Sequence, residues 1–284
     1  MPALWRGDGA PGLTTASAGG GAGALRVDLG SATSLARRIG FDGTDPRHFG
    51  AAAPRRWPLS LPGFSGEVRS GASCNCATLE LTPHCNGTHT ESVAHLVVDP
   101  QDVCELAPLG PLPALLLSLA TERADRADED SDPAPRPGDR LLTRAALRAA
   151  WPATLPFAPR ALLLRAVPPA LDAGPPPHDA EPPFLSRQLA RELVERGIEH
   201  LVVELPSIDR GHDQGRLCAH RVFFGLPPGS TRLAEARRPQ CTVTEFAAIP
   251  PSLPDGPCAL QLALPRIAGD AVPSQPLHFR LEVR

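Results

Sequence analysis

The chain has 284 residues, of which 35 are proline and 25 are glycine, and its formal charge of −3 offers no basic surplus for nucleic acid. All 28 basic residues are arginine and tyrosine is absent, which excludes lysine Schiff-base chemistry, a P-loop lysine and a tyrosine acid. No run of about 18 apolar residues is present, so no membrane partner is expected. Seven cysteines, an odd number, favour free thiols in a cytoplasmic protein; a secreted protein with one leftover thiol is the alternative.

The composition predicts a leader followed by a single domain. Residues 1–24 are rich in Gly, Ala, Ser and Thr without the apolar stretch of a signal peptide, which predicts a flexible leader. Residues 25–284 are expected to form one domain around one core. Within it, residues 122–140 are highly charged and contain three prolines, so we expect an exposed loop there.

Short apolar or alternating segments predict strands along this domain. They lie at residues 25–29, 74–81, 94–98, 106–121, 160–167, 198–205, 241–249, 258–264 and 277–283. Helices are expected at residues 141–151 and 185–197. The second has Ser186 as its N-cap and Gly197 as its terminating glycine. A strand, a helix and a strand in succession predict a parallel pair, and hence an α/β fold.

Three of the nine histidines fall within twelve residues. If this segment is extended, His89, Glu91 and His95 share one face; if it coils after Thr88, Glu91 and His95 meet one helical turn apart. His84 precedes them. Imidazole and carboxylate together suit zinc, manganese or iron. A metal site and three surface histidines on a polar loop are both compatible with the spacing.

The cysteines offer a weaker signal. Cys85, beside His84, is a candidate ligand, nucleophile or small buried residue. Cys74 and Cys76 lack the two-to-four-residue gap of structural zinc sites, so we expect them to be packed thiols on one strand face.

Residues 85–95 (CNGTHTESVAH) resemble the signature HxGTHxDxPxH of the metal-dependent cyclase family, which includes kynurenine formamidase (arylformamidase) and isatin hydrolase. Further regions resemble the family in the same order: residues 196–209, 219–221, 244–246 and 257–265. Three positions depart from the signature. Its first histidine falls on Cys85, its aspartate is Glu91 and its proline is Val93. We favour His84 as the displaced ligand.

The resemblance implies a site for one or two divalent ions, with zinc expected first and manganese as the alternative. Its ligands would be His84 (with Cys85 as the alternative), His89, Glu91, His220 and Glu245. His95 would be the general base or proton shuttle, and Glu245 would also take part in catalysis.

The resemblance also implies an architecture and an activity. The architecture is a single α/β domain with mixed sheets and helices in a swivelling β/β/α arrangement, assembled as a homodimer or higher homo-oligomer. The activity is hydrolysis of an aryl formamide such as N-formylkynurenine. The alternatives are a cyclic amide or lactone hydrolase, a cyclase, and a metal-binding member without catalysis. Phe49, Trp57 and Phe64 are candidates for walling an aromatic substrate or for packing the loop at residues 40–66.

Other polar residues receive structural expectations. His200 begins a predicted buried strand and is expected to be a core histidine. Asp209 is expected to fix a turn. Arg221 is expected in a structural salt bridge, with a substrate carboxylate as the alternative partner.

Overall fold

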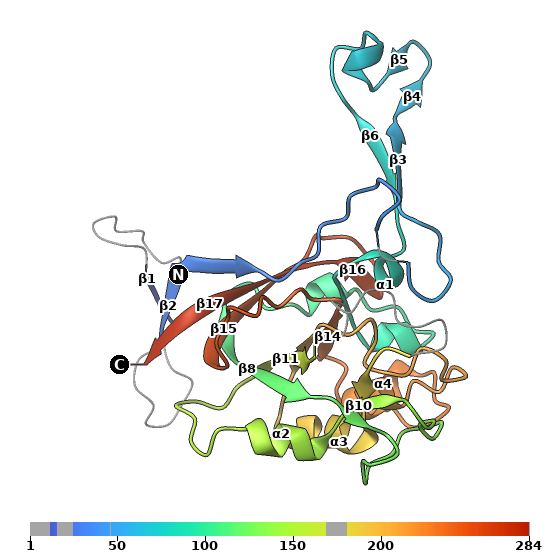
Figure 1. Ribbon diagram of the computed structural model, residues 1–284. Coiled ribbons are helices and arrows are strands. Elements are labelled where there is room, and N and C mark those ends of the chain that lie inside the picture. The colour runs from blue at the N-terminus through green and yellow to red at the C-terminus, as the bar shows by residue number, and fades with distance from the viewer. Residues whose placement is uncertain (1–11, 16–24, 46, 169–180, 284) are drawn as a thin grey trace.

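The computed structural model describes residues 12–15, 25–45, 47–168 and 181–283. Its centre is a mixed sheet whose strands follow the order β1-β2-β17-β15-β8-β11-β13-β14-β7-β16 (Figure 1). In that order the strands span Gly12–Thr15, Leu25–Ser34, Gln275–Val283, Gly256–Ala263, Leu112–Ala120, Ala161–Val167, His200–Val203, Thr242–Glu245, His89–Glu91 and Ala271–Pro273. The expected α/β class with mixed sheets is confirmed.

Strands β8, β11, β13 and β14 run parallel at the middle of the sheet, and their outer neighbours β15 and β7 run antiparallel to them. The helices are α1 (Pro83–Asn86), α2 (Arg144–Ala150), α3 (Arg187–Glu195) and α4 (Cys218–Phe224), with 3-10 turns η1 (Val68–Ser70), η2 (Val93–Leu96), η3 (Val103–Glu105) and η4 (Leu233–Glu235).

Leu162 and Leu164 belong to the core cluster that contains the apolar residues of α2, α3 and α4. Leu163 belongs to a second cluster with Leu260 and Leu35. Both faces of the parallel strands are therefore buried, as their continuous apolar sequence requires.

The expected strand, helix and strand between residues 160 and 205 are β11, α3 and β13, and the two strands are parallel. The side chain of Ser186 accepts the amide of Leu189 at 2.9 Å, and Gly197 has a φ of 73° beyond the helix end. The strand expected at residues 94–98 is wrong, because a 3-10 turn starts there instead. The hydroxyl of Ser92 accepts the amide of Ala94 and so favours the turn over extended backbone.

Residues 55–80 form an arm that stands away from the sheet (Figure 1). It consists of β3 (Arg55–Pro58) paired with β6 (Ala77–Glu80), and β4 (Ser60–Leu61) paired with β5 (Phe64–Ser65). The expectation of a loop therefore fails from residue 55 onward. The expectation of packed thiols also fails, because Cys74 and Cys76 are exposed in the arm, where no core is available to cover them.

The charged segment 122–140 is attached to the domain by more than its ends. A small sheet joins β12 (Phe184–Leu185), β10 (Arg140–Leu142) and β9 (Glu122–Arg123). The carboxylate of Glu129 accepts the amide of Arg144 at 2.8 Å and the hydroxyl of Ser186. The segment thus helps to satisfy the amino ends of α2 and α3, where a negative charge is favourable.

The leader expected at residues 1–24 lies outside the described residues except for residues 12–15, which pair with β2. Within the described part of the chain, no helix is long and apolar enough to cross a membrane.

Candidate metal centre

The histidine-rich segment passes through α1, β7 and η2, beside the carboxyl ends of the parallel strands β13 and β14. In the antiparallel pair of β7 and β14, His89 lies directly opposite Glu245. The backbone of Gly87 links α1 to β7, where a Cβ atom would come within 3.0 Å of Ile39. Helix α4 supplies His220 from a part of the chain far from the other histidines. The sheet and this helix together bring the expected ligands into one place.

Three imidazoles direct one nitrogen each toward two buried carboxylates. His84 Nδ1 lies 2.9 Å from Glu91 Oε2, and His220 Nε2 lies 2.5 Å from Glu91 Oε1. His89 Nε2 lies 3.5 Å from Glu245 Oε2, and His220 Nε2 is 3.4 Å from Glu245 Oε1. Glu91 and Glu245 are 1% and 3% exposed. This set includes every residue expected as a ligand except Cys85.

The opposite nitrogen of each imidazole has an oxygen partner of its own. His89 Nδ1 lies 3.0 Å from the carbonyl oxygen of Gly87, and His220 Nδ1 lies 2.7 Å from Asp209 Oδ2. His84 Nε2 lies 2.9 Å from Asp270 Oδ2. These oxygens accept a hydrogen bond from the nitrogen that they face. When a ring is neutral, as a metal ligand must be, its other nitrogen therefore presents a lone pair to the centre.

These contacts determine where charge is stable in the centre. Burial by itself would lower the pKa of His84, but hydrogen bonds to Asp270 and Glu91 outweigh it and raise that pKa to about 10. Burial would raise the pKa of Glu91, yet the charge and hydrogen bond of His220 hold it well below its ordinary value. Burial would lower the pKa of His220, but the charge of Glu91 and the carboxylate of Asp209 raise it well above its usual value. The centre therefore favours positive charge between buried carboxylates.

The residues present fit a divalent cation. His89 Nε2 is buried and has no hydrogen-bond partner among the described residues. Because Nδ1 of the neutral ring donates its N–H to the carbonyl of Gly87, the lone pair of Nε2 faces the carboxylate of Glu245. Two buried acceptors facing each other are unfavourable unless a cation lies between them. Mixed nitrogen and oxygen donors of this kind suit zinc, manganese or iron.

The possible ligand atoms fall into two sets that share one carboxylate. One set is His84, Glu91 and His95, and the other is His89, Glu91 and Glu245; within each set the atoms lie within 4.8 Å of one another. Glu91 belongs to both sets, so one or two ions are compatible with this geometry. His95 is thus a possible ligand as well as the expected proton acceptor, and His220 is in neither set, although its Nε2 faces both carboxylates.

Cys85 is in neither set, although it precedes Asn86 on the same short helix as His84. The thiol is buried, and burial raises its pKa, whereas His84 Nδ1 faces the Glu91 carboxylate. The geometry thus favours His84 over Cys85 as the ligand.

The sequence indicated Asp209 as a turn residue, which the family resemblance places near the site, and did not indicate Asp270. Asp209 accepts the amides of Ala219 and His220 as well as the ring of His220, so it fixes the first turn of α4. Asp270 lies 186 positions from His84 in the chain and belongs to no motif. Its other imidazole contact is with His95 Nδ1, at 3.4 Å.

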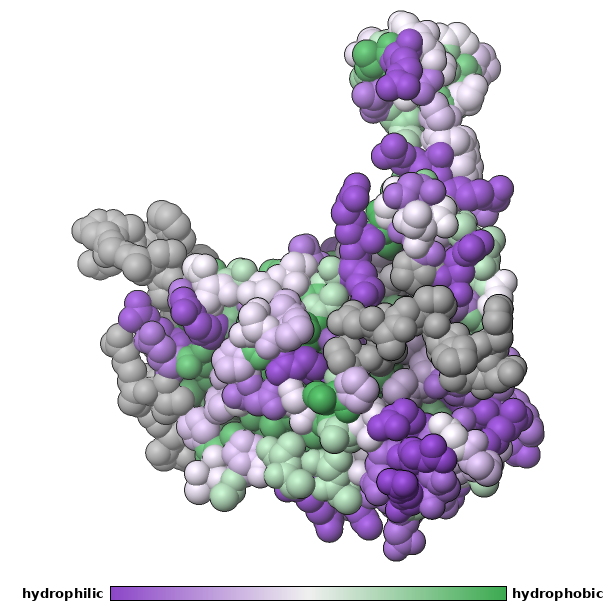
Figure 2. All heavy atoms as spheres, in the orientation of Figure 1, coloured by the Kyte–Doolittle hydropathy of each residue, from purple (hydrophilic) through white to green (hydrophobic). Residues whose placement is uncertain are grey.

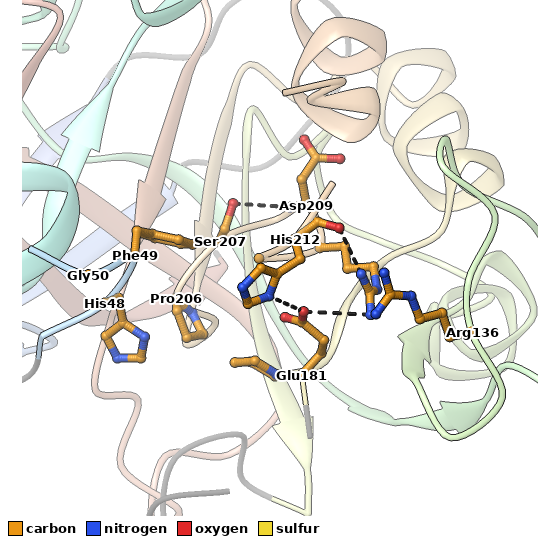
Figure 3. Close-up of a pocket in the computed structure, with 12 residues that line it drawn as sticks. His48, Phe49, Gly50, Arg136, Glu181, Pro206, Ser207, Asp209 and His212 are labelled. Atoms are coloured by element: carbon orange, nitrogen blue, oxygen red, sulfur yellow. Dashed lines mark hydrogen bonds and ion pairs between the residues drawn. The ribbon is translucent and has the colours of Figure 1, made fainter. Parts of the chain in front are cut away.

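A pocket of about 760 Å³ lies beside the centre, and none of the five expected ligands lines it. Figure 3 shows His48 and Phe49 on one side of it and Glu181, His212 and Arg136 on the other. The pocket shares Asp209 with the centre. Of the three aromatic residues expected to wall a substrate, Phe49 lines this pocket, whereas Trp57 and Phe64 lie in the arm.

The remaining expectations concern residues outside the centre. His200 is a buried core histidine as expected, 2% exposed, with Nδ1 2.9 Å from the hydroxyl of Thr242. Arg221 has a structural role: its guanidinium donates to the backbone carbonyls of Arg216, Pro227 and Ser230 rather than to a carboxylate.

The chain is similar to a known family and to several solved structures. Residues 29–210, more than half of it, match the family model described as "Putative cyclase". Isatin hydrolase A from Labrenzia aggregata is similar in structure, with a TM-score of 0.58 and 18% identity over 88% of this chain and 94% of that chain. Isatin hydrolase A from Ralstonia solanacearum has a TM-score of 0.56 and 16% identity over 88% and 91%. A structure titled a potential metal-dependent hydrolase with cyclase activity has a TM-score of 0.57 and 14% identity over 87% and 96%. At such identities the likeness shows a shared fold. No curated protein sequence matches the chain.

Proposed function

Because the chain belongs to the cyclase family, we propose that it is a metal-dependent hydrolase that cleaves the C–N bond of a small aromatic amide, with an aryl formamide as its first candidate substrate. One observation carries the proposal. Three imidazole nitrogens face Glu91 and Glu245, while the opposite nitrogen of each ring has an oxygen partner. Such prepared lone pairs beside buried carboxylates are the form that protein metal sites take.

The ligands in this proposal are those that the sequence resemblance implied, with zinc first and manganese as the alternative. They are His84, His89, Glu91, His220 and Glu245. A bound dication supplies two kinds of chemistry: it lowers the pKa of water toward about 7 and polarises the carbonyl that is attacked.

His95 moves the proton in this proposal. It is partly exposed, so solvent reaches it, and its Nδ1 faces Asp270, which leaves Nε2 to accept a proton from the attacking water. The water oxygen bonds to the carbonyl carbon, the C–N bond breaks, and Nε2 returns the proton to the departing nitrogen. The carboxylate of Glu245 is held in position because its Oε1 accepts a hydrogen bond from the amide of Ile208 at 2.7 Å.

The pocket supports an aromatic substrate. Phe49 is 54% exposed at the pocket wall, so an apolar ring there has uncovered surface for another ring. The backbone of Phe49 has a φ of 55°, a conformation that is costly for a bulky residue and is found preferentially at functional sites. A cyclic amide is the second candidate, since similar structures include isatin hydrolases.

The test is elemental analysis of the purified protein together with a substrate panel of a formanilide, isatin and a lactone. We expect bound zinc or manganese and the fastest turnover on the formanilide; fastest turnover on isatin would favour the cyclic amide. The His89→Ala variant should lose both metal and turnover. His212→Ala, which removes an exposed imidazole from the pocket rim, is the matched control for metal content. Full turnover by metal-free protein or by His89→Ala would contradict the proposal.

We further propose that the chain forms a homodimer or higher homo-oligomer through the arm. Four large apolar side chains are exposed along it, Trp57, Leu61, Val68 and Leu79. Figure 2 shows the arm standing clear of the body, with apolar surface among polar atoms. Exposed apolar surface gathered on a projection is typical of contact surfaces.

Light scattering after size exclusion tests this assembly. We expect a mass of at least twice the chain's 30.0 kDa, reduced to one chain by the double substitution Leu61→Ser and Leu79→Ser. The control is Val98→Ser, which removes an exposed apolar side chain from the body. A single-chain mass for the unaltered protein would refute the assembly and leave the hydrolase proposal standing.

We also assign the protein to the cytoplasm. All seven cysteines lie within the described residues and are free thiols. Free thiols, two of them exposed on the arm, persist in a reducing compartment. Cell fractionation with an antibody to the native chain would test this.

A further inference from the structure

Asp270 is held beside the metal centre by its backbone. It immediately precedes β16, which pairs with β7 so that Ala271 lies opposite Glu91. The carbonyl oxygen of Asp270 accepts the amide of Ser92 at 3.0 Å. The preceding residue, Gly269, donates its amide to Asp102 Oδ1 at 3.0 Å. The loop is therefore fixed on both sides without help from the side chain of Asp270.

The carboxylate of Asp270 is directed at two imidazoles. Its Oδ2 atom lies 2.9 Å from His84 Nε2 and 3.4 Å from His95 Nδ1. The two rings lie together, with centroids 4.2 Å apart and planes inclined by 32°. Among the described residues, no arginine shares this carboxylate, and the side chain is 43% exposed. The side-chain contacts of Asp270 are therefore with the two imidazoles of the centre, and they do not hold the loop in place.

An imidazole can present only one lone pair when it is neutral, and the partner of the other nitrogen decides which. With Oδ2 accepting from His84 Nε2, the lone pair of His84 is on Nδ1, the atom that faces Glu91. With the same oxygen accepting from His95 Nδ1, the lone pair of His95 is on Nε2. One oxygen therefore sets the tautomers of two rings that the proposed reaction uses differently.

We propose that Asp270 is a positioning residue that orients His84 as a metal ligand and His95 as a proton acceptor at the same time. The part that concerns His95 rests on the proposed hydrolase function, whereas the part that concerns His84 rests on metal binding alone. The contact also supports His84 as the ligand, because the Asp270 carboxylate faces its imidazole.

The first experiment measures metal affinity by competition with a chromophoric chelator, using zinc and manganese. Asp270→Asn should weaken binding about 10- to 100-fold, the usual cost of losing a carboxylate behind a histidine ligand. In a His84→Ala background the same substitution should change affinity by less than about twofold, because the residue acts through that ring. Asp102→Ala, which removes the acceptor of the Gly269 amide and so loosens the same loop without touching an imidazole, is the matched control and should leave affinity near that of the unaltered protein.

The second experiment measures hydrolysis at saturating metal. Asp270→Asn should lower kcat about tenfold or more with KM nearly unchanged, and it should have no further effect on a His95→Ala background. Asp270→Glu, which keeps the charge, should recover part of both affinity and kcat. The apo proteins are compared by circular dichroism, since a half-exposed side chain should be replaceable without unfolding.

The outcomes separate the two proposals. Additive effects of Asp270→Asn and His84→Ala on affinity, or equal losses in Asp102→Ala and Asp270→Asn, would overturn the positioning role. Metal binding with the expected coupling but no turnover on any amide would overturn the hydrolase function and the role toward His95, and would support the role toward His84. Failure of the unaltered protein to bind either metal would overturn both.

Discussion

The buried histidine of β13 gives a quantitative prediction about acid stability. Burial lowers the pKa of His200 to about 4, from 6.5 in an unfolded chain. Between pH 6.5 and pH 4, His200 therefore binds a proton in the unfolded chain but not in the native protein. The stability that His200 contributes is present above pH 6.5 and is lost as the pH falls toward 4. The gap between the two values corresponds to about 3 kcal/mol in total, of which about 2 kcal/mol is lost by pH 5.

His200 affects the metal centre because it connects two strands that lead to residues of that centre. His200 lies opposite Thr242, and its ring contacts the hydroxyl of that threonine. Strand β13 leads to Asp209, and β14 ends at Glu245. Charging His200 loosens this pair, so the centre should open under the same acid conditions.

The assay is urea unfolding followed by tryptophan fluorescence at pH 7.5, 6.0 and 5.0, for the unaltered protein, His200→Gln and His212→Gln. Wild-type stability should fall by about 2 kcal/mol more than that of His200→Gln between pH 7.5 and pH 5.0. His212 lies on the pocket rim outside the sheet, so its variant controls for the loss of an imidazole as such. The reasoning is refuted if the difference between wild type and His200→Gln is the same at every pH.

Three further substitutions probe the centre. Asp209→Asn should weaken zinc binding about 10- to 100-fold by chelator competition, because Asp209 orients His220; unchanged affinity would contradict this. Thr88→Val should cost about 1–3 kcal/mol in urea unfolding, since its buried hydroxyl donates to the carbonyl of Phe246 at 2.6 Å, and an unchanged midpoint would count against it. Cys85→Ser should leave metal content unchanged by elemental analysis, and a lost ion would identify the thiol as a ligand.

Local sequence was sufficient for features that depend on neighbouring residues. An apolar stretch interrupted by prolines predicted β8 and a continuous apolar run predicted β11, and the N-cap serine and terminating glycine bounded α3 closely. The spacing of His89, Glu91 and His95 predicted a cluster, and the segment proved to be extended through Glu91 and turned after it. Hydrophobic periodicity and capping act within a few residues, so they can be read along the chain.

Local sequence was misleading where the surroundings of a segment depend on parts of the chain that are distant in sequence. The alternation of residues 74–81 predicted a half-buried strand with packed thiols, but this strand belongs to the arm and has no core beneath it. Alternation records which residues share a face and does not say what that face meets.

The sequence by itself determined that this chain has an α/β domain with a cluster of metal-binding side chains in a signature like that of the cyclases. Only the tertiary structure decided which atoms meet. The register of β7 against β14 places His89 opposite Glu245, and the register of β16 against β7 brings Asp270 to His84 across 186 positions of chain. The physical reason is that a ligand's tautomer depends on a hydrogen-bond partner behind it, and that partner is supplied by pairing between strands far apart in sequence.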